Sequence, residues 1–139
     1  MAAELTSQFI SSVQPMTISR KRIWAGRIIT ALPVLFLLFD ATIKLLNIAP
    51  VVESFQRLGY PTGIAFAIGT LELVCLTLYV IPRTSYLGAV LLTGFLGGAV
   101  ATHVRVSDPL FSHILFPIYV GSLLWLGLYL RDDRIRKLI

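Results

Sequence analysis

The chain alternates long apolar segments with short polar ones. Four segments of about 20 residues are almost free of charged side chains, and they cover residues 28–46, 63–81, 84–104 and 110–130. At a rise of about 1.5 Å per residue, a helix of this length crosses the hydrocarbon layer of a membrane, which is roughly 30 Å thick. Backbone groups inside lipid must be hydrogen-bonded within the segment, so each segment is predicted to be an α-helix. The pattern therefore predicts an all-α membrane fold.

The connections between these segments predict how the helices are arranged. They cover residues 47–62, 82–83 and 105–109, and the last two are very short. Short connections make consecutive helices antiparallel neighbours, so the expected architecture is a transmembrane up-down four-helix bundle. Residues 1–19 are polar and are expected to form a flexible N-terminal segment. Residues 20–139 are then a single membrane domain.

Composition and charge agree with this interpretation. Of the 139 residues, 56% are hydrophobic and 14% are charged, against about 45–50% and about 25% in soluble domains. The net charge of +5 does not indicate nucleic-acid binding, because the basic residues form short clusters between uncharged runs. Four crossings place both termini on one side. That side carries most of the basic residues, namely Arg20, Lys21, Arg22, Arg27, Arg83, Arg131, Arg134, Arg136 and Lys137.

This charge asymmetry predicts the direction of the bundle. Only Lys44, Arg57 and Arg105 fall on the opposite side. Membrane proteins keep Lys and Arg in their cytoplasmic loops, so both termini are predicted to face the cytoplasm. The expected location is a bacterial-type inner membrane, and the expected partner is the lipid bilayer. A membrane redox partner and a second copy of the chain are further hypotheses.

Ionisable residues inside the apolar segments are the candidate functional residues. A charge in the middle of a membrane costs at least about 2.5–3.5 kcal/mol, so each one needs a partner or a function. In the predicted topology they gather in the outer half of the bundle, away from the termini. A ligand site or a buried polar network is therefore predicted there, formed by Asp40, Lys44, Glu72, His103, Arg105 and His113.

Structural interpretations of these residues stay open. Glu72 is either a hydrogen-bonded acid that joins two helices or a group that binds a ligand or a proton. Asp40 and Lys44 have the spacing of an ion pair within one helix. Arg105 and His113 could extend from the helix ends to the membrane surface, as long polar side chains do.

Other kinds of site have little support in the sequence. No spacing of His, Cys, Asp or Glu resembles a metal site, and the one cysteine, Cys75, is expected to be a buried packing residue. No glycine-rich nucleotide loop is present, because Gly94, Gly97 and Gly98 lie within an apolar segment. Their spacing instead predicts close helix packing inside the bundle, with a dimer face as the alternative. No metal and no catalytic residue is assigned.

At these residues the sequence resembles the DoxX-like family of small four-helix membrane proteins. The resemblance extends over about residues 20 to 137. It is carried by Trp24-x-Gly26-Arg27, Asp40 with Lys44, Leu58-Gly59-Tyr60-Pro61, Gly69-Thr70-Leu71-Glu72, Ile81-Pro82-Arg83-Thr84-Ser85, Leu87-Gly88-Ala89, Gly94 to Ala99, Ala101-Thr102-His103-x-Arg105 and Leu130-Arg131. The family takes its name from a subunit associated with quinone-linked sulfur oxidation, and other members accompany membrane redox or stress systems.

Three functional hypotheses follow. The first is an accessory or ligand-binding subunit of a membrane redox or stress system, holding a quinone-like or other small apolar ligand. The second is a proton-coupled transporter of small molecules that uses Glu72. The third is a structural membrane scaffold. An enzyme acting on its own is less favoured, because no nucleophile or cofactor motif is present.

Overall fold

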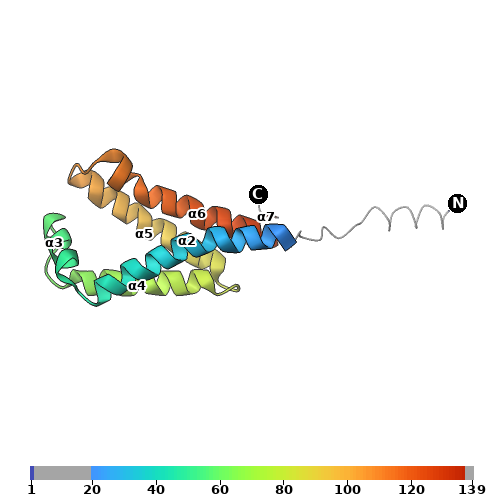
Figure 1. Cartoon of the computed structure of the whole chain (residues 1–139), viewed down its shortest axis with the longest axis horizontal. Helices are drawn as coiled ribbons and strands as arrows, with labels where there is room; N and C mark the ends of the chain where they lie inside the picture. The colour runs from blue at the N-terminus through green and yellow to red at the C-terminus, as the bar shows by residue number, and fades with distance from the viewer. Residues whose placement is uncertain (2–19, 137–139) are drawn as a thin grey trace.

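A computed structural model describes Met1 and residues 20–136 of the chain, and this part is built of helices without a strand. Figure 1 shows their arrangement. The helices are α2 (Arg20–Leu45), α3 (Ala49–Arg57), α4 (Ile64–Val80), α5 (Ser85–Arg105), the π-helix η1 (Leu110–Ile114), α6 (Phe116–Arg131) and α7 (Asp133–Arg136). The predicted all-α fold class is confirmed. The prediction of a flexible segment over residues 1–19 concerns positions that, apart from Met1, lie outside the described residues.

Four long helices pack side by side. Helix α2 lies against both α4 and α6, and α5 lies against the same two helices from the other side. The core between them is formed by leucines such as Leu37, Leu92 and Leu124, each at most 1% exposed. Tyr79 is fully buried there, and its hydroxyl donates a hydrogen bond to the Leu124 carbonyl at 2.7 Å. This bond links α4 to α6 across the bundle.

Three of the long helical segments have the length and composition of membrane spans. Three segments meet both conditions, Arg20–Leu45, Ser85–Arg105 and Leu110–Arg131, whereas the apolar helix Ile64–Val80 is shorter. Large apolar side chains such as Leu32, Phe39 and Phe66 are exposed on the outside. A contiguous apolar exterior on long helices is expected for a protein dissolved in lipid.

The connections contain more structure than the sequence pattern predicts. Residues 49–57 form α3, which begins with Pro50 in its first turn, whereas the sequence suggested only a connection. The predicted helix over residues 110–130 is divided into η1 and α6, and Pro117 lies in the first turn of α6. In η1 the backbone hydrogen bonds join residues five apart, such as Leu115 N to Leu110 O at 2.8 Å. Proline fits a first helical turn because it has no N–H to leave unpaired.

Close helix contacts occur at glycines, but not at the predicted ones. A Cβ atom at Gly88 would lie 2.2 Å from the backbone nitrogen of Tyr79, and one at Gly127 would lie 2.3 Å from Thr30 Oγ1. At Gly69, the Cβ would lie 2.8 Å from the Lys44 Cβ. These three positions let α4 approach α5, α6 approach α2, and α4 approach α2.

The structure does not place the Gly94, Gly97 and Gly98 stripe inside the bundle. A Cβ atom at any of the three would meet no described atom within 4 Å, so the expected packing within the chain is not found. The bulky Leu92 and Leu96 on the same helix point inward instead. Because α5 is apolar on all sides, its sequence could not distinguish the inner face from the outer one. A dimer face stays a prediction.

Gly88→Ala is expected to destabilise the bundle, whereas Gly94→Ala is expected to leave its stability unchanged or slightly raised. The first change pushes a methyl group into the backbone of Tyr79, and overpacking of this kind costs about 1–3 kcal/mol. The second meets open space and favours helix by up to about 1 kcal/mol. Unfolding of the two variants in mild detergent measures the difference. Equal stabilities would contradict the described α4–α5 contact.

Candidate functional site

The side chains of Asp40, Lys44 and Glu72 form one ionic cluster between α2 and α4, in which the Asp40 side chain is 29% exposed. The Lys44 ammonium lies 2.5 Å from Asp40 Oδ2, one turn earlier on α2, and 2.8 Å from Glu72 Oε2 on α4. The Lys44 side chain is 13% exposed and the Glu72 side chain is fully buried. The predicted ion pair within α2 is therefore present, and Glu72 extends it to a second helix.

Gly69 makes the bond between the two helices possible. It lies one turn before Glu72 on α4, and the space that its side chain would fill is occupied by the Lys44 Cβ and the Ala41 carbonyl of α2. Any larger residue there would push the two helices apart. A charge-assisted hydrogen bond requires a short distance between its atoms. The glycine therefore sets the helix separation at which Lys44 reaches Glu72.

The cluster contains more acidic groups than basic ones. Two carboxyl groups face a single ammonium group, so full ionisation leaves one negative charge inside an apolar bundle. In addition, Glu72 Oε1 is buried and has no hydrogen-bond partner among the described residues. Buried polar atoms are nearly always paired, and an unpaired one costs about 1–3 kcal/mol. The cluster can therefore accept one further hydrogen bond or one positive charge.

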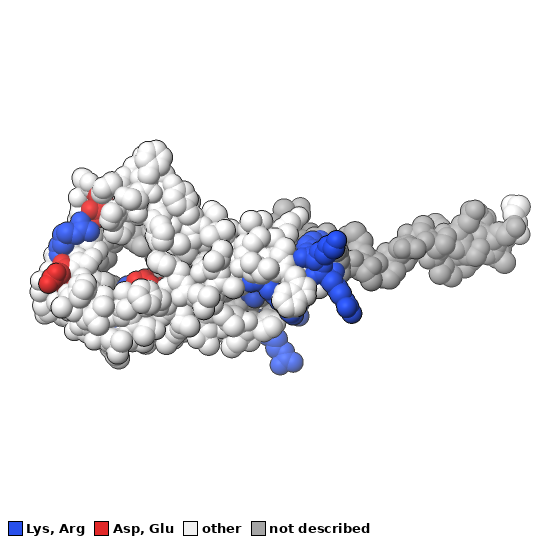
Figure 2. Space-filling view, in the orientation of Figure 1, with Lys and Arg blue, Asp and Glu red and all other residues white. Residues whose placement is uncertain are grey.

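The outer half of the molecule is hollowed beside α5. Figure 2 shows this hollow between the side formed by α3 and α4 and the side formed by α5, with acidic atoms on its floor. The cluster faces α5, since the Lys44 ammonium lies 5.5 Å from the centre of the Phe95 ring. Phe36, one turn before Asp40, contacts Phe116 with ring centres 5.1 Å apart. Ionic and aromatic groups thus meet in the outer half of the bundle.

A second polar group lies at the outer end of the bundle and joins α3 to α5. Asp108, in the loop after α5, accepts hydrogen bonds from Arg57 Nη1 of α3 at 2.7 Å and lies 2.6 Å from His103 Nδ1. Hydrogen bonds from Arg57 and, to a smaller extent, from His103 stabilise the ionised carboxyl of Asp108. They lower the pKa of Asp108 to about 2. Asp108 in turn raises the pKa of Arg57.

Further contacts attach the chain around α3 to α5. Arg105 Nη2 donates a hydrogen bond to the Leu58 carbonyl directly after α3, and the hydroxyl groups of Tyr60 and Thr102 lie 2.8 Å apart. His113 of η1 lies edge-on to His103, with ring centres 5.6 Å apart. All of these contacts lie at the outer end and involve polar side chains.

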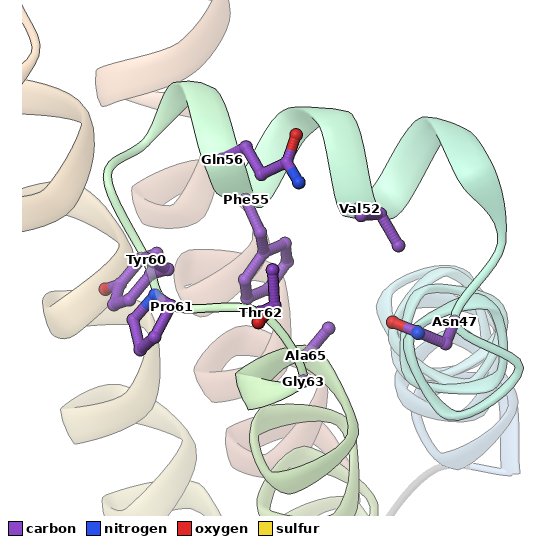
Figure 3. A pocket seen from close by; sticks show the side chains of 9 residues that line it. All are labelled: Asn47, Val52, Phe55, Gln56, Tyr60, Pro61, Thr62, Gly63 and Ala65. Atoms are coloured by element: carbon purple, nitrogen blue, oxygen red, sulfur yellow. The ribbon is translucent and has the colours of Figure 1, made fainter.

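A small cavity lies beneath α3. It has a volume of about 60 Å³ and is bounded by the end of α2, by α3 and by the start of α4. Figure 3 shows the side chains around it, among them Phe55 and Tyr60, whose rings are tilted by 42° with centres 5.5 Å apart. The cavity means that α3 does not pack tightly on the helices below it.

The six predicted site residues thus fall into two groups rather than one. Asp40, Lys44 and Glu72 form the ionic cluster, whereas His103, Arg105 and His113 lie in the outer-end group. The sequence did not identify Arg57 and Asp108 as site residues. Both lie in segments between the predicted spans, where charged residues are common. Within residues 20–136, no group of three or more His, Cys, Asp or Glu residues is arranged to hold a metal ion.

The contribution of Asp108 to stability should depend on pH in a defined range. Its partners favour the ionised carboxyl, so the folded state gains stability above the ordinary pKa of 3.8 and loses it as the pH falls towards about 2. The difference in unfolding free energy between the wild type and Asp108→Asn should be constant from pH 5 to about pH 4, then shrink towards pH 2. Glu53→Gln, on the exposed side of α3, is the control. A difference that persists to pH 2 would contradict the described contacts.

Comparison with known proteins supports one family. The model of the DoxX-like family matches residues 28–127, which include α3 to α5, most of α2 and α6, and both polar groups. No curated protein and no solved structure matches the chain. The match covers most of the sequence and the whole ionic cluster, and the chain belongs to the DoxX-like family of membrane proteins.

Proposed function

We propose that this protein binds a small apolar molecule through the Asp40–Lys44–Glu72 cluster, as an accessory subunit of a membrane redox or stress system. The unpaired oxygen of Glu72 is the observation that carries the proposal. Glu72 is fully buried, and Lys44 binds only one of its two carboxyl oxygens. A hydroxyl or amine group of a ligand would supply the missing hydrogen bond.

The surroundings of the cluster favour a ligand with a ring and a polar edge. Phe95 offers an aromatic face next to the Lys44 ammonium, and the Phe36–Phe116 ring pair lies one turn before Asp40 on α2. A quinone-like molecule in its reduced form has both parts, since its hydroxyl groups donate hydrogen bonds and its ring stacks on aromatic side chains. An apolar ligand of this kind would enter from the lipid.

The same proposal includes the orientation of the bundle. Helix α4 would cross the membrane with its neighbours, because its 17 residues span about 26 Å and it packs along both α2 and α5. The end with Arg20, Arg27, Arg83 and Arg134 would face the cytoplasm by the positive-inside rule. Figure 2 supports this, with basic atoms gathered at that end. A bacterial-type inner membrane is the proposed location.

Ligand binding is tested by comparing the wild type with Glu72→Gln. Purified in mild detergent, the wild type should retain a quinone-like or other apolar molecule that mass spectrometry detects above the lipid background. A short-chain benzoquinol should stabilise it by about 2.7 kcal/mol at a concentration 100 times the Kd.

The matched control for this experiment is Glu53→Gln, the same change on the exposed side of α3. Glu72→Gln should bind the benzoquinol at least about tenfold more weakly, since one charge-assisted hydrogen bond contributes roughly 1.5–3 kcal/mol. Glu53→Gln should bind it as the wild type does. If no molecule is enriched and the benzoquinol leaves the unfolding temperature unchanged, the proposal fails.

A second candidate function, proton-coupled transport, is favoured by the excess of acid over base in the cluster. A buried carboxyl group next to a second carboxyl can hold an exchangeable proton. Proteoliposomes would then show proton flux driven by a substrate gradient, and Glu72→Gln would abolish it. Flux that is absent, or that is unchanged in this variant, would exclude transport.

A further inference from the structure

We infer that α3 is a movable strap that closes the ionic cluster from water at the outer end of the bundle. This inference rests on the proposed function, because it assigns a regulation to the same site. In Figure 1, α3 rises from the end of the α2 and α4 pair towards the outer end of α5. In the same orientation, it forms the outer rim of the hollow in Figure 2.

The attachment of α3 to α5 is polar. It consists of the Arg57–Asp108 ion pair at 2.7 Å, the bond from Arg105 to the Leu58 carbonyl, and the Tyr60–Thr102 bond at 2.8 Å. The Arg57 side chain is 52% exposed and the Asp108 side chain is 7% exposed, so water reaches the contact from the Arg57 side. An ion pair with one partner open to water contributes little to stability. Such a contact holds the strap closed and still allows it to open.

The backbone turns sharply on both sides of α3. Asn47, just before α3, has a φ angle of 51°, and Gly59, just after it, has a φ angle of 75°. Both lie in the left-handed region, which ends a helix and redirects the chain. Elements that move about hinges commonly turn at a few such terminal residues.

The cavity beneath α3 leaves room for this movement. The cavity of about 60 Å³ separates part of α3 from the start of α4, and Phe55 points from α3 towards Ala65 beside it (Figure 3). Val51 and Leu58 are the buried apolar side chains of this region. A helix held by two buried side chains and a few polar contacts opens at a lower free energy than the bundle unfolds.

The strap determines from which side the cluster is reached. With α3 attached, the hollow is closed at its outer end and stays open on the face drawn in Figure 2, through which a molecule dissolved in lipid would enter. With α3 released, the cluster becomes accessible from the outer aqueous phase. The Arg57–Asp108–His103 contact is therefore the latch of the site.

The latch is tested by the rate at which a water-soluble thiol reagent reaches the hollow. A cysteine replaces Phe95, whose ring lies next to Lys44, in a chain that also carries Cys75→Ala. A positively charged methanethiosulfonate is added from the outer side of proteoliposomes. Arg57→Gln and Asp108→Asn should each raise the modification rate by up to about fivefold, and Arg57→Lys should raise it less.

Glu53→Gln is the control, because it removes a charge one turn before Arg57 on the exposed side of α3 and leaves the hydrogen bonds of the latch in place. It should leave the modification rate unchanged. Equal rates in the wild type, Arg57→Gln and Asp108→Asn would overturn the inference, as would an equal increase in Glu53→Gln. The measurement uses no ligand, so a failure of quinol binding and a failure of the strap are separate results.

Discussion

The Lys44 ammonium is the group on which the arrangement of the outer half depends. An unpaired charge in an apolar interior is strongly unfavourable, so Lys44 must keep its two carboxyl partners. One of them, Asp40, lies on the same helix, and the other, Glu72, lies on α4. Binding both fixes the register and the separation of α2 and α4. The close approach at Gly69 is part of the same constraint.

The two halves of the bundle are stabilised in different ways. The half near the termini is tightly packed, with Tyr79 buried and bonded to Leu124, and with Gly88 and Gly127 at close helix contacts. In the outer half, the charged cluster replaces some of this packing, the surface is hollowed, and α3 is attached to α5 by polar side chains (Figure 2). Close packing thus stabilises the inner half, whereas polar contacts stabilise the outer half.

The sequence predicted the fold class and the core of the site for a clear physical reason. A segment that crosses lipid must be a long apolar helix. Charged residues are rare in such segments, so Asp40, Lys44 and Glu72 could be recognised as candidates. Because α5 is uniformly apolar, the sequence does not show which of its faces points into the bundle. The position of Gly94 and its neighbours could therefore not be predicted. Helix α3 was missed because it is short and partly polar. Arg57 and Asp108 were missed because charged residues in connections are common, and only the fold brings these two together.

A double-mutant cycle on Lys44 and Glu72 tests the central claim most directly, with the free energy of unfolding as the measured quantity. Lys44→Met alone should cost about 3–5 kcal/mol, because it leaves buried carboxyl groups without their cation. Adding Glu72→Gln should restore part of that loss, which gives a coupling energy of at least about 1 kcal/mol. If the two effects instead add to within about 0.5 kcal/mol, Lys44 and Glu72 do not form one unit and the account of the cluster is contradicted.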